Sequence, residues 1–86
     1  MNGDEGLRAL GDRAYAKRLV GGLNVLELQI LRCVVAGMSG RDIATAKGIG
    51  LAEAEDLRIS MMTKLQARTT ADAVRIGLLA DVDRAD

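Results

Sequence analysis

The sequence predicts an all-α fold: a bundle of four short helices preceded by a short N-terminal extension. The chain has 86 residues, of which 49% are hydrophobic, and it contains no phenylalanine, tryptophan or proline. The core must therefore be built mainly from aliphatic side chains and methionine, which pack well between helices. From residue 23 onward these residues recur at three- and four-residue spacing, as they do on one face of a helix. No segment shows the alternation of a strand.

The N-terminal extension comprises residues 1–22. Five of the ten glycines fall in this segment, and glycine interrupts helical patterns. We therefore expect a flexible tail over residues 1–11, followed by a short helix over residues 12–20 with Asp12 as its cap.

The helical pattern of the first helix of the bundle begins at Leu23, and the helix is predicted to start at the cap Asn24 and to end at Gly37. Asn24 can accept hydrogen bonds from the free N–H groups of the first turn, and Glu27, three residues later, completes a capping box. Gly37 marks the end, because glycine readily adopts the left-handed conformation that terminates helices.

A short second helix and a longer third helix follow. Ser39 and Asp42 form another capping box, and Gly48 ends the second helix. The third helix is expected over residues 51–66. Its predicted inner face consists of Ala54, Leu57, Met61 and Leu65. Two helices joined by a short glycine-bearing turn are typical of a helix-turn-helix, although any small helical bundle shows this pattern.

The last helix is predicted from Thr69, with Asp72 in its capping box, through Val82. It is apolar on more than one face, and Val74, Leu78 and Val82 fit an inward face. The apolar surplus comprises Ala73, Ile76, Gly77, Leu79 and Ala80. Because a small bundle cannot bury both faces, we expect this helix to pair with a second chain.

Composition excludes most enzyme chemistry. Histidine is absent and cysteine occurs once, so the commonest general base and metal ligand are missing and no internal disulfide can form. The sequence predicts a protein that is not an enzyme and that has no cofactor or metal site. The polar N-terminus and the absence of an apolar run of ~18 residues predict a cytoplasmic protein that does not enter a membrane.

A more specific signal lies in residues 23–31 (LNVLELQIL), residues 36–44 (AGMSGRDIA) and Gly48-Ile49. The same register continues through Met61, Lys64-Leu65 and Ala73-Val74. This pattern resembles the LuxR/FixJ-type (GerE-like) DNA-binding domain, and the resemblance covers residues 23 to about 80.

The resemblance implies a LuxR-type helix-turn-helix domain over residues 23–82, with a C-terminal tail at 83–86. It implies that the third helix enters the major groove of double-stranded DNA and that the last helix forms a homodimer. A heterodimer with a related regulator would satisfy the same apolar surface. The implied role is regulation of transcription. The candidate DNA-binding residues are Arg41, Lys47, Glu55, Arg58, Lys64 and Arg68.

The third helix departs from the family pattern. Where the family usually carries Thr-Val-Lys-x-His, this chain has Glu53-Ala54-Glu55-Asp56-Leu57. Carboxylates near phosphates weaken binding, although Glu55 could accept a hydrogen bond from a cytosine amino group. Residues 23–80 contain seven basic and six acidic residues. This near balance differs from the excess of basic residues that is typical of DNA-binding domains. We therefore expect DNA binding that is weak or assisted by a partner.

The same acids lead to an alternative hypothesis, in which the third helix binds a protein. As an anti-activator or co-regulator, the chain would bind another regulator or RNA polymerase through exposed apolar residues rimmed by charge. The residues of this surface are Leu51, Glu53, Glu55, Asp56, Ile59 and Met62. The acids could instead simply complement the helix dipole, and Ile59 and Met62 belong to the core if the assumed phase is off by one residue. We rank DNA binding first.

Overall fold

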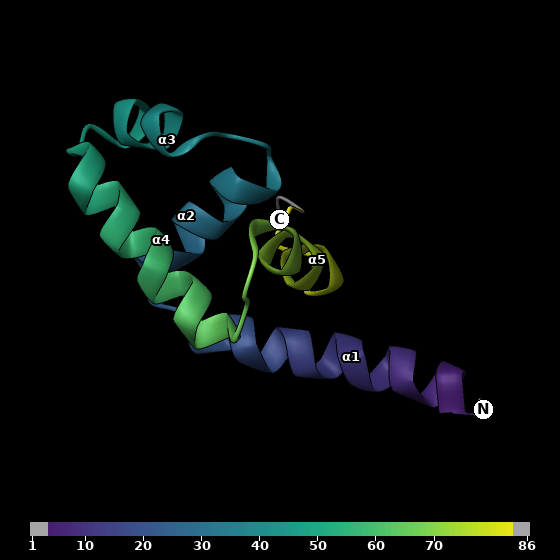
Figure 1. Cartoon of the computed structure of the whole chain (residues 1–86). Coiled ribbons are helices and arrows are strands. Elements are labelled where there is room, and N and C mark those ends of the chain that lie inside the picture. Colours follow the sequence, from purple (N-terminus) through teal and green to yellow (C-terminus); the bar gives the residue numbers. More distant parts are fainter. Residues whose placement is uncertain (1–3, 84–86) are drawn as a thin grey trace.

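The computed structural model describes the backbone of residues 4–83 and the side chains of residues 12–83. Within this range the chain forms five helices and no strand, which confirms the all-α prediction. The helices are α1 (Asp4–Gly21), α2 (Val25–Val35), α3 (Gly40–Lys47), α4 (Leu51–Leu65) and α5 (Thr70–Leu79). In Figure 1, α2 lies between α4 and α5, α3 lies at one end, and α1 extends away from the other end.

Helix α1 is longer than predicted, because it begins at Asp4 and not at Asp12. Asp12 therefore lies inside the helix and does not cap it. Gly6 and Gly11 each cost about 1 kcal/mol relative to alanine inside a helix, but they alternate with strong helix formers such as alanine, leucine and arginine. The C-terminal part of α1 packs on the bundle, where Ala16 is buried. Residues 1–3 of the expected tail and residues 84–86 lie outside the described residues. The predicted domain boundary between residues 22 and 23 stays a prediction.

The three predicted capping boxes all form, at Asn24, Ser39 and Thr69. In each, the side chain of the cap accepts from the backbone N–H three residues later, and the side chain of that later residue accepts from the N–H of the cap. Gly48 ends α3 in the left-handed conformation, as predicted, with φ of 67°. Gln66 ends α4 in the same conformation, with φ of 57°. These caps fix where each helix begins and ends.

The core forms around α2, which packs against both α4 and α5. Leu31, Met61 and Leu65 are fully buried, and Ala54 is buried beside them. Three of the four predicted inward positions of α4 are therefore confirmed, while Leu57 is half-buried at the edge of the core. The buried apolar residues of the cluster are Ile30, Leu31, Val34, Ile43, Ala44, Ala54, Met61, Leu65, Ala73 and Val82.

The predicted phase of α5 is wrong. Ala73 and Gly77, which were expected on the outer face, are buried against the core, whereas Leu78, expected inside, is 48% exposed. The small residues face α2 because they permit a close approach of the two helices: a Cβ on Gly77 would lie 2.7 Å from Cγ2 of Val35. Ile76, Leu79 and Ala80, the other residues of the predicted outer face, are half-buried.

Helix α5 also ends earlier than predicted, at Leu79. Asp81 adopts a positive φ of 59°, which turns the chain back. The N–H of Val82 then donates to the carbonyl of Gly77 at 3.0 Å, and Val82 is buried. Val82 is therefore a core residue, as expected, but it reaches the core from a turn and not from a helix.

Candidate nucleic-acid interface

The α3-turn-α4 unit has the form of a helix-turn-helix, with residues 48–50 between the two helices. Because Ala54, Met61 and Leu65 face the core, the period of 3.6 residues per turn fixes which positions face outward. This outer strip consists of Ala52, Asp56, Ile59 and Thr63, all of which are exposed. In Figure 1, α4 runs along the side of the molecule away from α5, so the strip is the part of the helix that could enter a groove.

The three acids of α4 point in different directions, although they are close together in the sequence. Asp56 alone lies in the outer strip. Glu53 is exposed on the flank toward α2, where it lines a small groove together with Leu26 and Lys47. Glu55 is on the opposite flank, and its carboxylate occupies the space that a side chain at Gly40, the first residue of α3, would fill. The outer strip is therefore less acidic than the sequence suggests.

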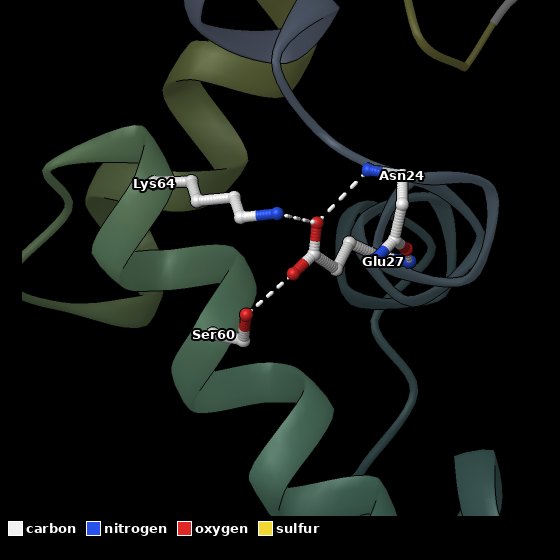
Figure 2. Close-up of polar contacts among 4 residues, drawn as sticks. All are labelled: Asn24, Glu27, Ser60 and Lys64. Atoms are coloured by element: carbon white, nitrogen blue, oxygen red, sulfur yellow. Dashed lines mark hydrogen bonds and ion pairs between the residues drawn. The ribbon is translucent and has the colours of Figure 1, made fainter.

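Lys64, a predicted DNA contact, forms an ion pair inside the protein. Its Nζ lies 2.8 Å from Oε1 of Glu27, whose side chain is 3% exposed. Figure 2 shows how Glu27 reaches from α2 to α4: one oxygen accepts from Lys64 and from the backbone N–H of Asn24, and the other accepts from the hydroxyl of Ser60. Every oxygen of the buried carboxylate thus has a donor, as a charge inside a protein requires.

These donors change the acidity of Glu27. The hydrogen bonds from Lys64, Ser60 and the N–H of Asn24 lower the pKa of Glu27 from its usual 4.5 to about 2, although burial acts in the opposite direction. Glu27 is therefore ionised under all ordinary conditions. The sequence identified Glu27 only as a helix cap. A further signal was available, since Glu27 lies three and four residues before Ile30 and Leu31 and so on the buried face of α2.

Arg58, another predicted DNA contact, also has partners within the protein. Its Nη2 donates to Oγ1 of Thr70 at the start of α5, and its Nη1 lies 4.0 Å from Oε1 of Glu55. Arg58 thus ties α4 to α5. The sequence could not show this contact, because Thr70 is 12 residues away and belongs to another helix.

Three of the predicted DNA-contacting residues have side-chain charges that are exposed and unpaired within the described residues. Within residues 12–83, the side chains of Arg41, Lys47 and Arg68 form no ion pair, and all three residues are exposed. Arg41 lies in the first turn of α3 and Lys47 in its last, while Arg68 follows α4. Arg41 and Arg68 therefore lie near the two ends of the helix-turn-helix, and Lys47 lies directly before its turn.

The candidate protein-binding surface is only partly exposed. Ile59 is 61% exposed and Leu51 is 46% exposed, whereas Met62 is half-buried and packs against the core. The alternative phase, in which Ile59 and Met62 are both core residues, therefore does not hold for Ile59.

A second apolar surface lies between α1 and α5. Its lining comprises Arg13, Ala71, Val74, Arg75, Leu78, Leu79 and Asp81. Of the predicted dimer residues, only Leu79 lines this groove.

In the described part of the chain, no cluster of histidine, cysteine, aspartate or glutamate could hold a metal ion. Among the same residues, no helix combines the length and apolar character that crossing a membrane requires.

Comparison with known proteins identifies a relative of this chain. Over 74 residues, the chain is 36% identical to the transcriptional regulatory protein FixJ of Azorhizobium caulinodans. The match covers 86% of this chain and 35% of FixJ, so the chain spans about a third of the length of the curated relative. No family model and no solved structure matches the chain. The similarity supports a LuxR/FixJ-like helix-turn-helix domain, and it does not bear on the acids of α4.

Proposed function

We propose that the chain regulates transcription by binding double-stranded DNA as a dimer through its helix-turn-helix. The observation that carries this proposal is that three exposed cations belong to the helix-turn-helix and its end: Arg41 and Lys47 lie in the first and last turns of α3, and Arg68 follows α4. The similarity to FixJ, whose name describes a transcriptional regulatory protein, supports the same role.

The chemistry of the outer strip suits a shallow contact with base edges. Ile59 and Ala52 can contact thymine methyl groups, Thr63 can donate or accept a hydrogen bond, and Asp56 can accept from a cytosine amino group. The outer strip contains no arginine or lysine. It therefore cannot read guanine through the hydrogen bonds that these side chains usually form. Affinity would then depend mainly on the three flanking cations, which implies modest binding with a clear dependence on salt.

The salt dependence provides the first test. With three phosphate contacts per copy, the slope of log K against log salt should be about −3 per copy, at about −0.9 for each phosphate. Fluorescence anisotropy of duplex DNA should show that Arg41→Ala and Lys47→Ala each weaken binding and reduce the slope by about 1. Lys17→Ala removes a cation from α1, which lies at the opposite end of the molecule from α3 (Figure 1), and should leave the slope unchanged. Failure of the wild type to bind duplex at low salt would refute the proposal.

The groove between α1 and α5 supports the dimer. Val74 and Leu78 present apolar surface there, and the rim carries both signs of charge in the ion pairs Arg13–Asp81 and Arg75–Asp12, at 3.8 and 3.4 Å. A second copy carries the same balanced charges, so two grooves related by a two-fold axis can face each other without net repulsion. The burial of Ala73 and Gly77 excludes these two residues from the dimer face.

We expect light scattering to show a dimer at high micromolar concentration and a monomer for Leu78→Lys, because the lysine places a charge in the apolar contact. Ile59→Lys is the matched control, since it adds the same charge at an exposed apolar position of α4, and it should remain dimeric. A monomeric wild type, or a Leu78→Lys variant with the mass of a dimer, would contradict the α5 interface.

A second candidate function rests on the exposure of Ile59 and Leu51 beside Asp56. In this alternative, α4 binds another regulator or RNA polymerase, and the chain acts as an anti-activator or co-regulator. The anisotropy experiment separates the two functions: an absence of DNA binding at low salt, together with a stoichiometric protein complex that Ile59→Lys abolishes, would favour the second candidate.

A further inference from the structure

Arg58 is the cation nearest the middle of α4, and its guanidinium has two partners inside the chain. It donates to Oγ1 of Thr70 in the first turn of α5 and lies 4.0 Å from Glu55. Glu55 and Arg58 are three residues apart, so their side chains lie on the same flank of α4. Both side chains remain partly open to solvent, at 46% and 31% exposure. A phosphate could therefore approach the pair without unfolding the bundle.

The carboxylate of Glu55 lies against the start of α3. Gly40, the first residue of α3, has no side chain, and a Cβ at this position would collide with the carboxylate of Glu55. The side chain of Leu51 borders the same space. The missing side chain thus leaves room for the carboxylate between α3 and α4, within reach of Arg58. Glu53, on the opposite flank of the same helix, has no ion pair within residues 12–83.

We propose that Glu55 competes with DNA phosphate for Arg58 and thereby limits the strength of the DNA contact. This inference rests on the proposed function and adds a residue that sets its affinity. A guanidinium that is paired with a carboxylate neutralises less phosphate charge, so its contact with a phosphate releases fewer of the cations condensed on the DNA. In the wild type, Arg58 therefore contributes little to affinity. Without the charge on Glu55, Arg58 becomes a fourth phosphate contact.

The test measures duplex DNA binding by anisotropy over a salt series for Glu55→Gln, Arg58→Gln and the double variant. Glu55→Gln should bind roughly five- to tenfold more tightly at about 0.1 M salt, with a slope steeper by about 0.9 per copy. Arg58→Gln alone should change affinity less than twofold. In the double variant, most of the gain from Glu55→Gln should disappear, because that gain depends on Arg58.

Glu53→Gln is the matched control, since it removes the same charge from the same helix without touching the ion pair. The change in DNA affinity that Glu53→Gln causes should be the same in the wild type and in the Arg58→Gln background. If Glu55→Gln and Glu53→Gln have equal effects that do not depend on Arg58, the inference is wrong while the DNA-binding function stands. If only Glu55→Gln binds DNA, the inference holds, and unaided DNA binding by the wild type does not. If no variant binds, both are refuted. Circular dichroism would verify that each variant is folded.

Discussion

Replacing Lys64 with methionine is expected to lower the free energy of unfolding by about 2 kcal/mol at pH 7. The reason is that Glu27 would remain ionised and buried without its charged partner. The shift of the pKa of Glu27 from 4.5 to about 2 corresponds to about 3 kcal/mol. Part of this energy comes from the hydrogen bonds of Ser60 and Asn24, which the variant keeps. Lys64 is also 43% exposed, so water screens its charge and further reduces the expected loss. Urea unfolding followed by circular dichroism would measure the change.

Acid unfolding tests the same ion pair from the side of the carboxylate. Because the pKa of Glu27 is lower in the folded than in the unfolded chain, the folded chain binds fewer protons between those two values. The stabilisation is therefore complete above about pH 5 and is lost as the pH falls toward 2. Glu27→Gln, which keeps the shape but cannot ionise, should lack this part of the pH dependence.

Lys17→Met serves as the control for Lys64→Met, because Lys17 is exposed on α1 and forms no ion pair within residues 12–83. Its effect should stay within about 0.5 kcal/mol. If Lys64→Met were equally harmless, or if Glu27→Gln lost stability between pH 5 and 2 as steeply as the wild type does, the ion pair would not stabilise the fold. A loss of DNA affinity in Lys64→Met would then require a direct phosphate contact.

Features that depend on nearby residues were predictable from the sequence. The capping boxes at Asn24, Ser39 and Thr69 each involve residues only three positions apart, so the sequence contains all the information they need. Most of the inner face of α4 was predictable because Ala54, Met61 and Leu65 recur at helical spacing, whereas Leu57 is only half-buried. The start of α1 was not, because strong helix formers around Gly6 and Gly11 offset the cost of the glycines.

The candidate site was less predictable, because its charges are decided by contacts between helices. Lys64 and Glu27 are 37 residues apart, and no local pattern links them. The acids of α4 lie within four residues of one another, yet the carboxylate of Glu55 lies against α3, in space that Gly40 leaves open. The sequence correctly identified which residues are charged but could not show which of them remain available to a ligand.

The phase of α5 illustrates a different limit, and it leads to a prediction about Gly77. Because α5 is apolar on more than one face, its periodicity fits two phases, and the close approach to α2 selects between them. A Cβ on Gly77 would lie 2.7 Å from Val35 Cγ2, 3.1 Å from Val82 Cγ2 and 3.4 Å from Leu31 Cδ1. Gly77→Val should therefore destabilise the fold by about 3 kcal/mol, the upper part of the range for overpacking. Thermal and urea unfolding would measure this loss.

The direction of the smaller change, Gly77→Ala, decides between packing and helix propensity. Propensity alone would stabilise α5 by about 1 kcal/mol, whereas overpacking costs about 1–3 kcal/mol, so we expect a net loss. Removing the obstructing methyl groups with Val35→Ala should recover part of that loss, which a double-mutant cycle would detect as a coupling of at least about 0.5 kcal/mol. Ala71→Val adds bulk to the exposed side of α5 and should have little effect. A Gly77→Ala variant more stable than the wild type, with no coupling to Val35, would show that α5 can move away from α2 at little cost.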